Sequence, residues 1–134
     1  MTLYLDTSAV VALHIDGPQR ATARSALGVD RAWCTSALTL TEALALIDRV
    51  TDEVALRGDL EDLVRLTWDH LAVVPVDQLC LDRASQLMRE QPLRLGDALH
   101  LAAADRLPRP VRFLTFDAGQ IPVALSMDFE VLSA

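Results

Sequence analysis

The sequence predicts an α/β domain with a mostly parallel central sheet of four to five strands, flanked by helices. Short apolar segments alternate along the chain with longer segments of helical periodicity. The short segments are apolar without alternation, which is typical of parallel strands buried on both faces. The chain has 134 residues, and no repeat or linker divides it. We therefore expect one domain spanning residues 1–134.

The expected strands are short, and each ends at a turn or a capping residue. They cover residues 2–5, 32–35, 71–76, 111–116 and 129–132. Pro75 favours an edge position or an early end for the third strand, because proline cannot donate to a strand ladder.

The expected helices are identified by apolar periodicity and by their start and stop signals. They cover residues 9–14, 18–28, 36–50, 51–70, 77–91 and 95–107, with a short one over 121–126. Asp6, Ser36 and Asp77 are the expected caps, and Pro18 suits a first helical position. Gly58 weakens helix 51–70 and would divide it into a helical hairpin, and Pro122 intrudes on the last helix. Val54, Leu60, Leu63 and Val64 are the residues expected to face the core from helix 51–70.

The charge pattern excludes several functions. The net charge is −7, which argues against a protein that coats DNA generally. All 12 basic residues are arginines. A chain without lysine has no Walker A lysine and no Schiff-base lysine, and it lacks the lysine of a receiver-like phosphoacceptor site.

The sequence favours a cytoplasmic protein that does not enter a membrane. It starts without the basic region and long apolar run of a signal peptide. The longest uncharged stretches, Ala32–Thr41 and Ala118–Met127, are far shorter than a membrane span. Cys34 and Cys80 have no C-x-x-C spacing, so we expect two buried free thiols.

Asp97 is an acid in the first turn of a nearly apolar helix, Leu95–Ala104. A buried carboxylate without a partner costs several kcal/mol. One explanation is helix capping, since a carboxylate at a helix N-terminus gains about 0.3–1 kcal/mol. The other is a metal site formed with other acids of the chain. Taken alone, Asp97 favours capping.

Three further acids change that balance. Asp6 and Asp117 each follow an expected strand, and the carboxyl ends of parallel strands are where sites form. Glu42 lies on or beside the apolar stripe of its helix. Each acid alone has a structural explanation, but four together favour Mg²⁺ or Mn²⁺, which prefer oxygen ligands. His100 lies about one turn after Asp97 and could form a hydrogen bond nearby, but we expect it to be a packing residue.

Four motifs that carry these acids resemble those of PIN domains, and the acid order resembles VapC-type toxins of bacterial toxin–antitoxin pairs. The motifs are Asp6-Thr7-Ser8-Ala9, Thr41-Glu42-Ala43, Gly96-Asp97-Ala98-Leu99-His100 and Leu114-Thr115-Phe116-Asp117-Ala118. The resemblance covers essentially the whole chain. One departure is Gln120, where many members carry an aromatic or other apolar residue.

The resemblance implies a Mg²⁺-dependent endoribonuclease in which Mn²⁺ can substitute for Mg²⁺. Asp6 and Asp97 match the acids that hold metal directly, and Glu42 and Asp117 match acids that do so directly or through water. Thr7 and Thr115 match supporting hydroxyl residues. Attack by a metal-activated water would leave a 5′-phosphate and a 3′-hydroxyl.

The resemblance also implies partners: an RNA substrate, a cognate VapB-type antitoxin protein that wraps the toxin, and a second copy in a homodimer. Local arginines would meet the RNA phosphates. The alternative is a PIN-like module that binds RNA or protein without cutting, in which the acids are structural.

Overall fold

The computed structural model of the chain describes residues 1–133 and shows strands and helices in alternation. The strands are β1 (Thr2–Leu5), β2 (Ala32–Ser36), β3 (Ala72–Val74), β4 (Val111–Leu114) and β5 (Glu130–Leu132). The helices are α1 (Thr7–Ala12), α2 (Pro18–Val29), α3 (Thr39–Val50), α4 (Val54–Trp68), α5 (Gln78–Glu90), α6 (Leu95–Asp105) and α7 (Ile121–Ser126).

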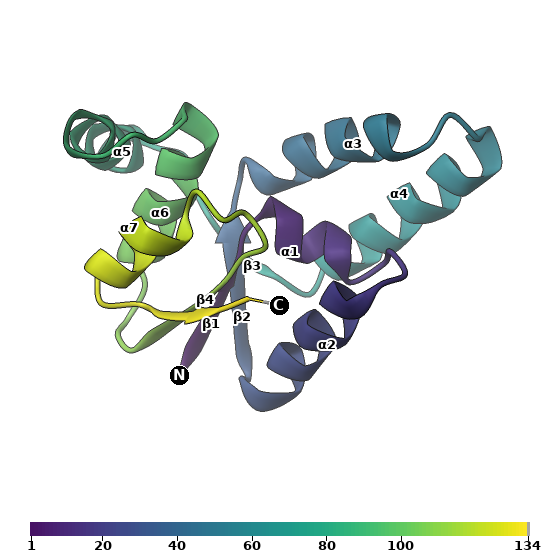
Figure 1. Cartoon of the computed structure of the whole chain (residues 1–134), viewed down its shortest axis with the longest axis horizontal. Coiled ribbons are helices and arrows are strands. Elements are labelled where there is room, and N and C mark those ends of the chain that lie inside the picture. Colours follow the sequence, from purple (N-terminus) through teal and green to yellow (C-terminus); the bar gives the residue numbers. More distant parts are fainter. Residues whose placement is uncertain (134) are drawn as a thin grey trace.

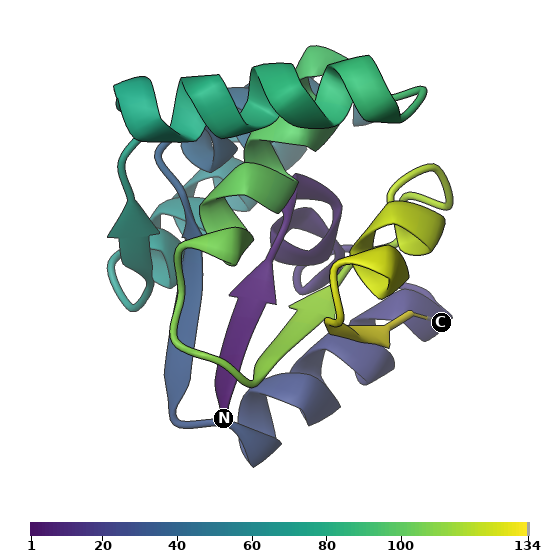
Figure 2. The ribbon, with the colours of Figure 1, turned by 90° about the vertical axis from the view of Figure 1, so that its left-hand side faces the viewer.

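The five strands form one parallel sheet in the order β3-β2-β1-β4-β5, which Figure 2 shows from left to right. This confirms the predicted fold class. The first strand is central, because β1 pairs with β2 on one side and with β4 on the other. Strand β3 lies at an edge and ends before Pro75, as the proline predicts.

Helices cover both faces of the sheet (Figure 1). Helices α5, α6 and α7 lie on one face, and α1 to α4 lie on the other. Side chains of β1 alternate between the two cores: Tyr4 packs under α6, whereas Leu3 and Leu5 pack under α1 and α3. Helix α6 is the most buried helix, as its apolar sequence predicts, with Ala98 to Ala104 all buried.

The local signals place most helix starts correctly. Asp6 and Asp77 cap α1 and α5 by accepting hydrogen bonds from the N–H groups of Ala9 and Cys80. Pro18 is the first residue of α2. Gly17 precedes it with φ of 147°, a backbone conformation that glycine adopts without strain.

Three local predictions are wrong. Ser36 ends β2 and accepts a hydrogen bond from the N–H of Leu38, so α3 begins at Thr39 and not at Ser36. Gly58 does not divide α4, because the helix continues from Val54 to Trp68. Pro122 does not prevent α7, because it lies in the first turn, where no N–H is needed.

Helix α4 also buries fewer side chains than its sequence predicts. Leu60 and Val64 are buried, but Val54 and Leu63 are exposed. The reason is visible in Figure 1, where α3 and α4 form a hairpin that extends away from the sheet. Within residues 1–133, no helix has the length and apolar character needed to cross a membrane. Cys34 and Cys80 are buried free cysteines, as expected.

Candidate active site

All four predicted acids line one cavity of about 480 Å³. Asp6 directly follows β1. Thr115 directly follows β4, and Asp117 lies two residues later. Glu42 comes from the first turn of α3, and Asp97 comes from the first turn of α6. The parallel sheet thus brings residues from both ends of the chain to the carboxyl edge of its central strands.

The carboxylate of Asp6 is buried and fully hydrogen-bonded. Its Oδ1 accepts from the Ser8 hydroxyl at 2.7 Å and from the N–H of Ala9 at 3.0 Å. Its Oδ2 accepts from the Thr115 hydroxyl at 2.5 Å and from the Gln120 amide at 2.9 Å. Burial raises the pKa of Asp6 although the nearby His100 and these donors oppose the rise. The side chain is therefore both a helix cap and a wall of the cavity.

Asp97 and Asp117 lie beside each other on the opposite wall. Partial burial, the charge of Asp117 and a shared hydrogen bond with it raise the pKa of Asp97 to about 6. Arg94 and His100 oppose this rise. Asp97 does not cap α6, because the N-cap position belongs to Arg94 and no side chain caps this helix. A cation bound beside Asp97 would oppose this rise in its pKa, because it favours the charged form of the carboxylate.

Glu42 is held through one of its two oxygens. Its Oε1 accepts from the Thr7 hydroxyl at 2.6 Å and from His100 Nε2 at 2.6 Å. Partial burial alone would raise the pKa of Glu42, but the hydrogen bonds from His100 and Thr7 outweigh burial and lower it. The other oxygen, Oε2, lies over Gly96, where an added Cβ would be only 2.8 Å away. Gly96 therefore leaves room for this carboxylate.

His100 is buried and connects the cavity to the core. Its Nδ1 contacts the Tyr4 hydroxyl at 2.7 Å, and its Nε2 contacts Glu42. Burial raises the pKa of Tyr4 well above its usual range, with the charge of Asp6 adding to the effect, so the hydroxyl keeps its proton. The expectation of a histidine that only packs is wrong. In an apolar helix, spacing alone could not identify the partner, which comes from another helix.

Gln120 is a second cavity residue whose role the sequence did not reveal. It is 2% exposed and directly contacts Asp6. Its Oε1 is buried without a hydrogen-bond partner among the described residues. The signal in the sequence was a polar side chain three residues after Asp117, where similar proteins carry an apolar one.

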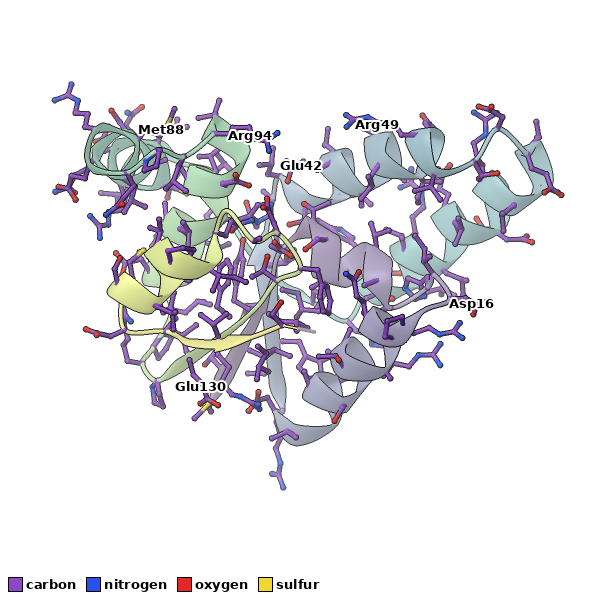
Figure 3. The ribbon with its side chains drawn as sticks, viewed as in Figure 1. Asp16, Glu42, Arg49, Met88, Arg94 and Glu130 are labelled. Carbon is purple, nitrogen blue, oxygen red and sulfur yellow. The ribbon has the colours of Figure 1, made fainter. Side chains whose placement is uncertain are left out.

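Two arginines, Arg49 and Arg94, also line the cavity. Figure 3 labels them on either side of Glu42 along one edge of the molecule. Neither forms an ion pair within residues 1–133. The cavity thus combines acidic walls with a cationic rim.

The donor chemistry fits a hard divalent cation, because the four acids supply only oxygen ligands and the charge of Asp117 raises the pKa of Asp97. Within the described residues, no three side chains of His, Cys, Asp or Glu are already grouped as a set that could hold a metal ion. Carboxylate oxygens of Asp6 and Glu42 instead accept hydrogen bonds from other side chains of the protein. Thr7 and Thr115, the predicted supporting hydroxyl residues, donate to Glu42 and Asp6 respectively.

Comparison with known proteins agrees with this arrangement. Residues 3–129 match the PIN domain family. Over 133 residues, the chain is 32% identical to Ribonuclease VapC46 of Mycobacterium tuberculosis, and the match covers 98% of this chain and 96% of the relative.

Solved structures share the fold at lower identity. VapBC-5 of Mycobacterium tuberculosis, a member of the VapBC family of toxin–antitoxin systems, has a TM-score of 0.70 at 18% identity, with both chains covered completely. VapC20 of the same organism, described as a Sarcin-Ricin loop cleaving toxin, has a TM-score of 0.71 at 19% identity, covering 91% of this chain and 95% of its own. The family match over nearly the whole chain, with the acid-lined cavity at the expected edge of the sheet, shows that this chain belongs to the PIN-domain family.

Proposed function

We propose that this chain is a Mg²⁺-dependent endoribonuclease and the toxin of a toxin–antitoxin pair. The observation that carries the proposal is the convergence of Asp6, Glu42, Asp97 and Asp117 on one cavity. The 32% identity to a ribonuclease of the VapC type supports RNA as the substrate. VapC20, which is described as a toxin that cleaves the Sarcin-Ricin loop, has the same fold.

In this proposal Asp6 and Asp97 hold the metal directly, and Glu42 and Asp117 hold it directly or through water. Bound Mg²⁺, or Mn²⁺ in its place, would supply an activated water and neutralise charge on the phosphoryl group. Thr115 and Gln120 orient Asp6 through its Oδ2. Thr7 and His100 keep Glu42 ionised. The expected products carry a 5′-phosphate and a 3′-hydroxyl.

The rim arginines suit an RNA substrate. Arg49 and Arg94 line the cavity without ion pairs of their own in the described residues, so their guanidinium groups are available to phosphates. This local cationic rim allows a chain of net charge −7 to bind a polyanion.

The partners belong to the same proposal. A cognate VapB-type antitoxin would neutralise the toxin, as the VapBC-type complexes of similar fold suggest. We also propose that the chain acts as one domain, as a homodimer and in the cytoplasm.

Cleavage of total cellular RNA by the purified chain tests the function. The reaction is run with Mg²⁺ or Mn²⁺, with EDTA, and with the variants Asp6→Ala and Asp97→Asn, and the new ends are mapped by sequencing. Discrete cuts with 5′-phosphates that disappear with EDTA and in both variants support the proposal. If folded protein free of antitoxin makes no cuts, the non-cleaving binding module is the better description. Cuts that persist with EDTA contradict the metal mechanism.

A further inference from the structure

Tyr4, His100 and Glu42 form a continuous hydrogen-bonded chain from the core to the cavity. Tyr4 lies in β1 at the centre of the sheet, His100 in α6 and Glu42 in α3. The Tyr4 hydroxyl is 2.7 Å from His100 Nδ1, and His100 Nε2 is 2.6 Å from Glu42 Oε1. Tyr4 is 0% exposed and His100 is 2% exposed, so the bond between them is shielded from water, whereas the Glu42 side chain is 35% exposed.

The direction of each bond follows from its acceptors. An ionised carboxylate only accepts, so the hydrogen between His100 and Glu42 belongs to Nε2. In a neutral imidazole the other nitrogen, Nδ1, is then an acceptor, and the Tyr4 hydroxyl is its donor. Glu42 therefore fixes this tautomer of His100, and the Tyr4 hydroxyl holds the ring at its other nitrogen, Nδ1.

The packing of the aromatic rings holds these hydrogen-bonded side chains in place. Tyr4 stacks on Phe113 with ring centroids 5.2 Å apart, and its ring meets His100 edge-on at 6.0 Å. Phe113 in turn stacks on Phe129 at 5.8 Å. The hydroxyl of Tyr4 is thus anchored by the core of the α5–α7 face and does not depend on groups in the cavity.

These hydrogen bonds also determine which carboxylate oxygen of Glu42 remains free. Both donors, His100 Nε2 and the Thr7 hydroxyl, use Oε1. Oε2 lies over Gly96, the residue before Asp97. Glu42 therefore offers Oε2 on the side of the cavity where the Asp97 segment begins.

We infer that Tyr4 and His100 are positioning residues of the active site: Tyr4 holds the His100 ring through Nδ1, and His100 pins Glu42 Oε1 so that Oε2 is presented to a divalent cation. This inference rests on the proposed function, because it takes Glu42 as a metal ligand. Partners that orient a ligand in this way commonly contribute about 10–100-fold in metal affinity or activity.

The test combines a direct observation of the tautomer with Mn²⁺ binding. The variants are Tyr4→Phe, which removes one hydroxyl, and His100→Gln and His100→Leu. Gln keeps an N–H donor, whereas Leu has none. The control is Thr39→Val, which removes a hydroxyl from the buried 2.6 Å contact between Thr35 and Thr39 without touching an acid. All are measured for unfolding in EDTA, so that a loss of metal binding is compared at known stability.

In metal-free protein, ¹⁵N NMR of the imidazole rings is expected to show His100 with its hydrogen on Nε2. The chain has three histidines, so the spectrum is simple to assign. Tyr4→Phe is expected to leave the hydrogen on Nε2 and to shift the Nδ1 resonance, because Nδ1 loses its hydrogen-bond partner. Calorimetry is expected to show Mn²⁺ binding weakened about 3–10-fold in Tyr4→Phe and about 10–100-fold in His100→Leu, with partial recovery in His100→Gln.

Three results would overturn the inference. One is an Nδ1 resonance of His100 that is unchanged in Tyr4→Phe. Another is Mn²⁺ affinity in Tyr4→Phe and His100→Leu equal to that of the unmodified chain. The third is an equal loss in Thr39→Val, which would mark a general effect of core damage. Absence of Mn²⁺ binding by the unmodified chain is a different failure, because it contradicts the proposed metal site itself.

Discussion

The amide of Gln120 donates to Oδ2 of Asp6 across 2.9 Å, although 114 residues separate the two in the chain. The same oxygen accepts from Thr115. Two donors therefore hold the one oxygen of Asp6 that does not cap α1. The other end of the Gln120 amide, Oε1, is buried without a partner in the described part of the chain.

Replacing Gln120 with Leu should weaken metal binding most at low pH. The loss of a donor to the charged form raises the pKa of Asp6 further, and a metal must then displace a more tightly held proton. We expect Mn²⁺ affinity by calorimetry to fall several-fold at pH 6 and much less at pH 8. An equal loss at both pH values would mean that Gln120 acts through packing.

Removal of the Asp97 charge should flatten the pH dependence of stability in EDTA. The pKa of Asp97 is raised to about 6 in the folded chain, so the folded state binds a proton that the unfolded state has lost. Stability from this group is therefore present at low pH and declines as pH rises through about 6. We expect Asp97→Asn to melt higher than the unmodified chain at pH 7.5, with the gap closing toward pH 5.

The matched control for that comparison is Asp52→Asn, an exposed acid between α3 and α4. It should keep the pH profile of the unmodified chain. A profile of Asp97→Asn that runs parallel to the unmodified chain at every pH would show that the pKa of Asp97 is not raised in the folded chain.

Mn²⁺ should stabilise the folded chain by mass action. A ligand that binds only the folded state at 100 times its Kd adds about 2.7 kcal/mol to the free energy of unfolding. We expect the melting temperature to rise with millimolar Mn²⁺ and Asp6→Ala to lose most of that rise. An unchanged melting temperature of the unmodified chain would count against a metal site.

Gly96 and Gly58 should respond oppositely to alanine. At Gly96 the added Cβ would be 2.8 Å from Glu42 Oε2, a carboxylate that Thr7 and His100 hold in place. We expect Gly96→Ala to displace Glu42 and to lower RNA cleavage and Mn²⁺ affinity. Gly58 is exposed within α4, with nothing within 4 Å of an added Cβ, so Gly58→Ala should add about 0.5–1 kcal/mol of stability without loss of cleavage. Full cleavage by Gly96→Ala would show that Glu42 is free to move.

Arg49 and Arg94 should carry part of the salt dependence of RNA binding. Each phosphate contact with a single strand contributes a slope of about 0.7 in log affinity against log salt. We expect Arg49→Ala and Arg94→Ala, each in an Asp97→Asn background that does not cut, to weaken RNA binding and lower this slope by about 0.7 in fluorescence anisotropy. Arg31→Ala is the control, because Arg31 precedes β2 and so lies at the amino ends of the strands, away from the cavity at their carboxyl ends. Loss of affinity in Arg31→Ala of the same size would indicate a diffuse charge effect.

Sequence patterns were sufficient for the fold, and the rule that parallel strands end at one edge predicted that Asp6 and Asp117 would lie near one cavity. Helix starts such as Asp6 and Asp77 were predictable from capping chemistry. Ser36 and Pro122 were misjudged, since a strand can continue through a capping residue and a proline is harmless in a first turn.

The contacts of Tyr4, His100 and Gln120 were beyond sequence reasoning. Tyr4 and Gln120 lie among buried apolar residues, and their partners are about 100 residues away in the chain. No local pattern distinguishes a histidine that fills the core from one that holds a carboxylate. That distinction depends on how α3 and α6 are packed against β1.

The central position of β1 has a consequence for when this chain can act. Strand β1 pairs with β4 on its second side. The segment after β4 supplies Thr115, Asp117 and Gln120 to the cavity, so the cavity is complete only after β4 has paired. The residues that precede β4 therefore cannot form the complete cavity on their own, even when the earlier helices have already folded. A nuclease built in this order has no complete cavity until β4 and the segment to Gln120 have been synthesised.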